Sequence, residues 1–199
     1  MKPVNWSAVS AIAHTVTALA TIGAFIFAGV QIYEFREEAK IQNLREQVDK
    51  FEGSRFTEIR KSLATERTDT KQQRLKRLDP SDPPLELYDE LNFCEDLGLL
   101  TRRGALDLHD VWSEFSYWLF PVYTDARPVI DSDIKDSPAT FVDCTWLVDK
   151  MRPIEAKEDA GALDHPSEND IYEFYAGEFT VEPGQPVQKG KHITKSGQQ

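Results

Sequence analysis

The chain of 199 residues lacks charge near its N-terminus. Residues 3–33 contain no Lys, Arg, Asp or Glu, although these four residue types make up 29% of the sequence. Within this segment, residues 8–30 are Ala, Val, Ile, Leu, Phe and Gly apart from five Ser, His and Thr residues. A helix needs about 20 such residues to cross a hydrocarbon core about 30 Å thick. The absence of charge therefore predicts a transmembrane helix within residues 1–33.

Two other interpretations fit this segment less well. A cleaved signal peptide has an apolar core of about 7–15 residues behind a basic start, whereas this segment is longer and Lys2 is its only early basic residue. A long helix of a globular protein would show a charged face. Basic residues are retained on the cytoplasmic side of a membrane, and four of them follow the segment: Arg36, Lys40, Arg45 and Lys50. We therefore expect a single-pass protein of the inner (cytoplasmic) membrane, with its N-terminus outside and its C-terminus cytoplasmic.

Cysteine and recognisable catalytic motifs are also scarce. Cys94 and Cys144 are the only cysteines, and their wide separation gives no metal or redox motif. The chain has no phosphate-binding glycine loop, nucleophile elbow or Cys–His pairing. The sequence thus predicts no enzyme activity, no metal and no cofactor. In a reducing cytoplasm, both cysteines are expected to remain thiols.

Basic and acidic residues are unevenly distributed. Residues 51–78 hold eight basic and four acidic residues, and residues 79–199 hold ten and twenty-five. A basic cluster beside a membrane can bind anionic lipid at about 1 kcal/mol per residue, but a solvated helix face is the simpler explanation. Nucleic-acid binding is disfavoured because the acidic remainder repels phosphate and no binding motif is present. The candidate lipid contacts are Arg55, Arg60, Lys61, Arg67, Lys71, Arg74, Lys76 and Arg77.

The predicted fold class is mainly α. The transmembrane helix is expected to continue into a juxtamembrane helical segment over residues 34–78, as two short helices or one helix kinked at Gly53. The prolines in residues 79–84 must break a helix, and Ser81 or Asp82 is placed to cap the next one.

Residues 79–152 are expected to form a small cytoplasmic helical domain. Its first helix covers residues 85–97, and a second starts near Asp107 and ends or restarts at Pro121. A third starts with Ser137 as its cap and stops at Pro153. Residues 153–199 are rich in Gly and Pro, which predicts a loose acidic tail with a strand at residues 171–181.

A family resemblance accompanies this pattern. The apolar N-terminal segment is followed by a basic segment, the run Leu91–Leu100, and the sequence Arg102-Arg103-Gly104-Ala105-Leu106-Asp107. In these features the chain resembles small bacterial membrane-anchored helical proteins that are known only as a domain of unknown function. The resemblance covers residues 8–152 and implies a bacterial inner-membrane protein. It implies no catalytic residues.

The polar cluster Asp107, His109 and Asp110 has two interpretations. It resembles part of a hydrolase or metal site, but His109 lacks a second ligand at a helical spacing. Asp107 instead precedes an apolar helical pattern, where its carboxylate can accept hydrogen bonds from the free amides of the first turn. We therefore predict that Asp107 is a helix cap.

A second pattern lies within the apolar segment. Small and hydroxyl-bearing residues recur there at alternating spacings of 3 and 4, which form one helix face: Ser10, His14, Thr17, Thr21, Ala24 and Ala28. Such a face allows close packing of a second transmembrane helix, and predicts a homo-oligomer. In the alternative, the hydroxyl groups bond to carbonyls of their own helix and His14 lies near the interface with water.

Three functions follow from these features. The preferred function is a membrane-anchored, non-enzymatic interaction or regulatory protein that binds an unknown cytoplasmic protein at the inner membrane. The first alternative is an oligomer that perturbs the membrane, of the toxin or phage-defence type. The second is an anchored enzyme with an unrecognised site.

Overall fold

The computed structural model describes residues 6–158 and 165–179, except for the side chains of residues 6–13, 15, 16 and 18. The fold is mainly α, as predicted, with six helices and one short hairpin in these residues. The chain divides into two compact units, residues 1–41 and residues 42–199. Each unit is described separately below.

Helix α1 (Trp6–Glu52) contains residues 6–33 of the charge-free segment and ends in the second unit. Helix α2 (Ser54–Arg67) follows after one residue, Gly53, whose extended backbone separates the two helices. Of the two arrangements that the sequence allowed, the structure therefore has two helices. In the described part of the chain, no helix is both long and apolar enough for a membrane crossing. The predicted transmembrane helix is consequently not supported by the structure.

A hairpin and a proline-rich turn separate α2 from α3 (Leu85–Arg102). Strands β1 (Thr68–Asp69) and β2 (Arg74–Leu75) are antiparallel, with Thr68 opposite Leu75. Helix α3 begins directly after Pro84 and has no side-chain cap. The predicted cap at Ser81 or Asp82 is therefore wrong, because the prolines delay the start of the helix until Leu85.

Proline does not end either of the next two helices. Helix α4 (Leu108–Asp136) continues through Pro121 and Pro128, and α5 (Val142–Glu158) continues through Pro153. The predicted boundaries at Pro121 and Pro153 are therefore wrong. An internal proline costs about 3 kcal/mol, which burial of the apolar residues on both sides can offset. Ser137 follows the last residue of α4 and does not cap α5.

Helix α6 (Glu168–Glu178) lies in the segment predicted to be a loose tail. The strand predicted at residues 171–181 is wrong, since residues 171–178 are helical; residues 180–181 lie outside the described residues. Ser167 and Asp170 form a capping box that starts this helix. The rest of the predicted tail after Phe179 also lies outside the described residues.

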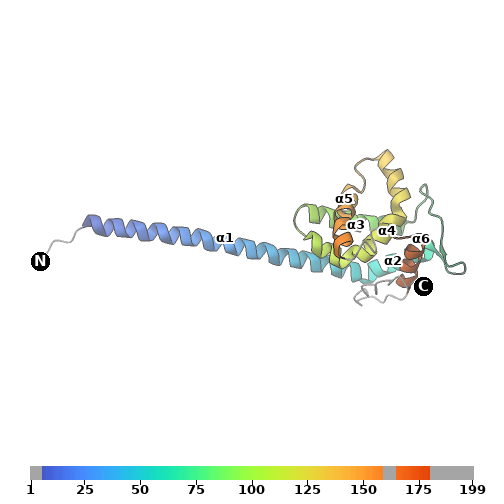
Figure 1. The fold of residues 1–199 in the computed structure, drawn as a ribbon, viewed down its shortest axis with the longest axis horizontal. Coiled ribbons are helices and arrows are strands. Elements are labelled where there is room, and N and C mark those ends of the chain that lie inside the picture. Colours follow the sequence, from blue (N-terminus) through green and yellow to red (C-terminus); the bar gives the residue numbers. More distant parts are fainter. Residues whose placement is uncertain (1–5, 159–164, 180–199) are drawn as a thin grey trace. The chain divides into compact units, whose positions relative to one another are not determined.

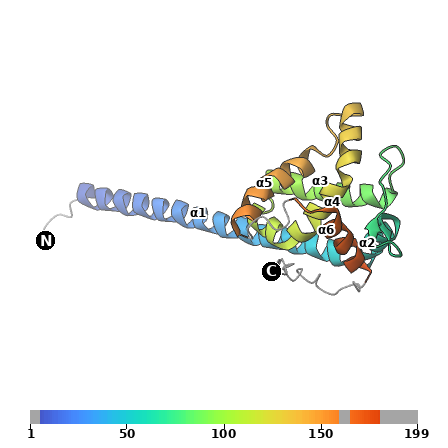
Figure 2. The same cartoon turned by 45° about the vertical axis from the view of Figure 1, so that its right-hand side comes forward.

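The core of the second unit combines an aromatic cluster with close helix packing. The rings of the aromatic cluster come from the end of α1 and from α2, α3 and α4, with centroid separations of 4.9–6.1 Å: Phe51, Phe56, Phe93, Phe115 and Trp118. Helices α3 and α5 lie side by side, and α6 packs against α2, α4 and the hairpin (Figures 1 and 2). These contacts bring charged side chains from four helices into the interior.

Candidate functional site

The interior of the second unit contains ionisable side chains whose burial the sequence pattern did not predict. We call them the buried charge cluster, and α2, α3, α4 and α6 each contribute to it. Each member is at most 9% exposed: Arg60, Arg67, Glu90, Asp125, Tyr175 and Glu178. Because charge is costly to bury, such residues occur inside proteins mainly in pairs or at functional sites.

Arg67 and Asp125 form the best-aligned pair of the cluster. The Arg67 Nε and Nη2 atoms each donate to a different oxygen of Asp125 at 2.7 Å. The Tyr175 hydroxyl donates to Asp125 Oδ2 at 3.0 Å, which joins α6 to this pair. Burial alone would lower the pKa of Arg67, but the hydrogen bonds and the charge of Asp125 raise it overall. The fork geometry and the low local dielectric make this a strong pair.

Arg60 and Glu178 form a second pair with poorer geometry. Arg60 Nη1 lies 3.2 Å from Glu178 Oε2, yet neither atom is aligned for a hydrogen bond. Among the described residues, Arg60 Nε also has no hydrogen-bond acceptor, while Nη2 donates to Thr57 Oγ1 at 3.5 Å. The guanidinium carbon lies 4.3 Å from the ring centroid of Phe51, where a cation–π contact adds stabilisation. Arg60 is thus buried with unused donor capacity.

Glu90 is fully buried and interacts electrostatically with members of both pairs. Burial raises its pKa well above the ordinary value, and the charges of Glu178 and Asp125 raise it further, whereas Arg60 opposes the shift. Burial also raises the pKa of Glu178, against the opposing charge of Arg60. With Glu90 protonated, the cluster holds two cations and two anions, which is the balance that a low-dielectric interior favours.

A sequence signal for these residues exists. Arg60 and Arg67 fall in phase with the apolar residues Phe56 and Leu63, at spacings of 4, 3 and 4. Glu90 lies three residues after Leu87 on the apolar face of α3. A charge that falls in phase with an apolar helix face is a candidate for burial, but a partner on another helix cannot be identified from that pattern.

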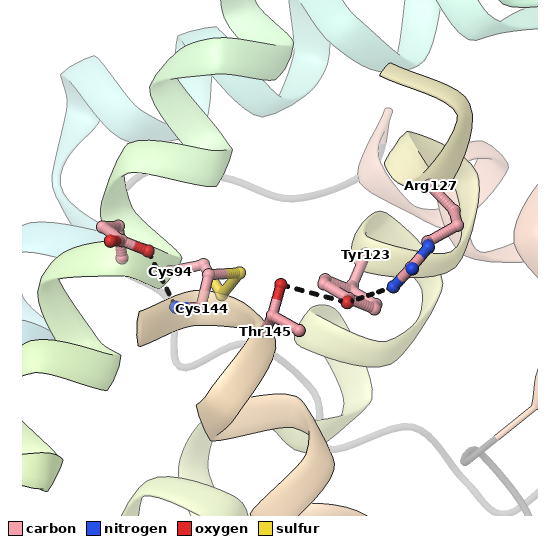
Figure 3. Close-up of a disulfide and its surroundings, with 6 residues drawn as sticks. Cys94, Tyr123, Arg127, Cys144 and Thr145 are labelled. Carbon is pink, nitrogen blue, oxygen red and sulfur yellow. Dashed lines mark hydrogen bonds between the residues drawn. A yellow bond between two sulfur atoms is a disulfide. The ribbon is translucent and has the colours of Figure 1, made fainter. Parts of the chain in front are cut away.

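A disulfide joins α3 to α5 near the cluster (Figure 3). Cys94 and Cys144 are bonded, their Cα atoms are 5.0 Å apart, and both residues are buried. The prediction that the cysteines remain thiols is therefore wrong for this structure, because helix packing joins positions that are far apart in sequence. Beside the disulfide, the Tyr123 hydroxyl donates to Thr145 Oγ1 at 3.3 Å and accepts from Arg127 Nη1 at 2.7 Å.

The predicted helix cap is confirmed. Asp107 precedes α4, and its carboxylate accepts hydrogen bonds from the amides of His109 at 2.8 Å and Asp110 at 3.4 Å. The His109 ring is exposed and lies 5.2 Å from the ring of Trp112. Over the described residues, no group of three or more His, Cys, Asp or Glu side chains is arranged to hold a metal.

The candidate lipid contacts divide into two groups. Arg60 and Arg67 lie in the buried charge cluster and are unavailable to lipid, so these two assignments are wrong. Lys61 is half-buried. The remaining candidates are exposed: Arg55, Lys71, Arg74, Lys76 and Arg77.

The predicted association face in the first unit is partly described. The side chain of Ser10 lies outside the described side chains. The other side chains on this face are exposed: His14, Thr17, Thr21, Ala24 and Ala28. The Thr21 hydroxyl donates to the Thr17 carbonyl of the same helix at 2.9 Å. This bond matches the alternative in which a hydroxyl group is satisfied within its own helix.

The fold and the buried charge cluster define the class of protein as a helical domain stabilised by internal ion pairs. The chain belongs to the family described as "Domain of unknown function (DUF4760)", whose model matches residues 10–151. The resemblance to a family without an assigned function is thereby confirmed. No curated protein and no solved structure shows a significant match to the chain. Helix α6 lies beyond the matched residues, although it supplies two members of the cluster.

Proposed function

We propose that the chain is a membrane-anchored, non-enzymatic interaction or regulatory protein of a bacterial inner membrane. The observation that carries the anchoring is the exposure of large apolar side chains in the first unit. These side chains are 50–75% exposed: Leu19, Ile22, Phe25, Ile26, Phe27, Val30, Ile32, Tyr33 and Phe35. A contiguous exposed apolar surface of this kind is typical of a contact with a membrane or a partner protein.

The charge-free sequence favours lipid as the covering for this surface. Lys or Arg at the centre of a membrane helix costs about 2.5–3.5 kcal/mol, and residues 3–33 contain neither. The exposed basic residues of α2 and the hairpin can add contacts with anionic headgroups. The apolar segment then serves as the anchor and the second unit as the interaction domain.

Fractionation of cells that express the full chain tests the anchor. We expect the wild type in the membrane fraction after an alkaline carbonate wash, and we expect Phe25→Lys with Ile26→Lys to shift the chain to the soluble fraction. Leu85→Lys is the matched control because Leu85 is 79% exposed but lies in the second unit. A wild type that is extracted as readily as the double variant would contradict the anchor.

Two observations bear on the side of the membrane on which the second unit lies. The basic residues after the apolar segment favour the proposed cytoplasmic C-terminus. A buried disulfide is typical of an oxidising compartment, and Cys94 and Cys144 form one. Because the cytoplasm keeps thiols reduced, the disulfide argues against the cytoplasmic orientation, whereas the basic residues argue for it.

One experiment resolves this orientation. A C-terminal reporter that is active only outside the cytoplasm should stay silent. An active reporter would overturn the cytoplasmic orientation. The anchor would be unaffected by that result.

A membrane-perturbing oligomer is the second candidate function. The observation in its favour is that small residues of the predicted association face, including Ala24 and Ala28, are exposed, and small residues allow two helices to pack closely. Thr17→Leu and Ala24→Leu should weaken self-association in a transmembrane association assay, whereas Phe25→Leu, on another face, should not. Equal signals from all three variants would reject this interface.

A further inference from the structure

Helix α6 occupies a charged surface that belongs to the rest of the domain. Arg60, Arg67, Glu90 and Asp125 lie within the residues that the family model matches, and we call them the α6 seat. Helix α6 lies outside the matched residues. The family domain thus provides the seat, and a segment beyond it provides the occupant.

Helix α6 interacts differently with the two arginines of the α6 seat. At Arg67, the guanidinium is already paired with Asp125 of α4, and α6 only adds the Tyr175 hydroxyl. At Arg60, the carboxylate comes from Glu178 of α6, without hydrogen-bond alignment, and Nε has no acceptor in the part of the chain that the structure describes. Because a buried arginine requires an anion, the seat selects an acidic side chain, and α6 satisfies this requirement incompletely.

Helix α6 also has the features of a separable unit. Its start is stabilised within its own sequence, since Ser167 and Asp170 bond to each other's backbone amides at 3.2 and 2.8 Å. Its buried face consists of Ile171, Tyr172, Tyr175 and Glu178. An amphipathic helix with regularly spaced anchors that lies in a groove is a common mode of peptide recognition.

We propose that the α6 seat is a docking site for an acidic amphipathic helix of a partner protein, and that α6 is its built-in competitor. The partner helix carries a tyrosine and a glutamate three residues apart, as Tyr175 and Glu178 are in α6. This inference rests on the proposed function as an interaction protein. A covalently attached competitor acts at an effective concentration of the order of millimolar, so the partner binds fully only when α6 is released.

Cleavage of the full chain between α5 and α6 tests this competition. Residues 159–164 are replaced by a protease recognition sequence. The protein is kept in detergent, and its binding of a probe is measured before and after cleavage. The probe is a fluorescent peptide of residues 165–179, followed by anisotropy. We expect the cut protein to bind the peptide and the uncut protein to bind it about tenfold or more weakly.

Two peptide variants, which change the net charge by the same amount, test the specificity of the α6 seat. Glu178→Lys should abolish binding because it places a second cation beside Arg60, whereas Glu173→Lys should bind like the parent because Glu173 is exposed. Equal binding of both variants, or equal binding to cut and uncut protein, would overturn the proposal. Loss of helical circular dichroism on cleavage would also overturn it, because α6 would then be an integral part of the core. The assay uses no membrane, so failure of the anchor is detected separately by fractionation.

Discussion

Replacing Gly98 with Ala should destabilise the second unit, although alanine favours a helix. Gly98 lies in α3 where the backbone of α5 passes closest. A Cβ at this position would lie less than 3.0 Å from the carbonyl of Asp143 and 3.1 Å from the Cys144 nitrogen. These atoms belong to the backbone, so no rotation of a flexible side chain can relieve the overlap.

The two energies that compete at this position differ in size. Alanine gains about 1 kcal/mol over glycine inside a helix. Overpacking costs about 1–3 kcal/mol and occasionally more, and the upper end applies because α5 cannot easily move. Cys144 is held by its disulfide to Cys94 and by a 2.8 Å hydrogen bond from its amide to Glu95 Oε2. We therefore expect a net loss of about 2 kcal/mol, which corresponds to a fall of about 4–8 °C in Tm for a unit of this size.

Thermal and urea unfolding of the Gly98→Ala variant measure this loss. Gly177→Ala in α6 is the matched control, since no atom within 4 Å would meet its new Cβ. The control should be unchanged or more stable by up to about 1 kcal/mol. A Gly98→Ala variant as stable as the wild type would refute the close approach of α3 and α5.

Four further predictions concern stability. Replacing both Cys94 and Cys144 with Ser should lower the free energy of unfolding by about 2–4 kcal/mol under oxidising conditions; a difference that persists in reductant would contradict this reason. Asp107→Ala should cost about 1 kcal/mol and Asp107→Asn much less in urea unfolding; equal losses would argue against capping. Asp125→Ala should cost about 3–5 kcal/mol because it leaves a buried arginine unpaired, and a loss below 1 kcal/mol would exclude a buried pair. Burial raises the pKa of Glu90 above its ordinary 4.5. The stability that this residue contributes is therefore complete below pH 4.5. It is lost as the pH rises through the higher pKa of the folded state, by at most about 1.4 kcal/mol per pH unit. Glu90→Gln should therefore flatten the fall in stability that begins above pH 4.5, and an unchanged profile would contradict a raised pKa for Glu90.

Local signals predicted some elements because nothing in the tertiary structure opposed them. The apolar face of α3 and the cap at Asp107 are examples, since each depends on residues within one or two helical turns. The helix break at Gly53 was also visible, although the choice between a kink and two helices was not.

Other elements depend on contacts that the sequence pattern does not contain. Pro121 is buried inside α4, where packing on both sides outweighs the lost hydrogen bond. Residues 171–178 are helical because α6 packs on α2, α4 and the hairpin, so the tertiary context overrides the composition of the tail. A prediction of the buried charge cluster requires the position of each charge on its helix face and the identity of its partner on another helix. Only the position on the helix face can be read from the sequence.

The disulfide also encloses the whole of α4 in a covalent ring. Cys94 and Cys144 are separated by 50 positions, and all of α4 lies between them. A protease that cuts the exposed residues 137–139 between α4 and α5 would therefore leave both fragments in one molecule. The fragments would separate on a denaturing gel only after reduction, so intact mobility without reductant is not evidence of an uncut chain.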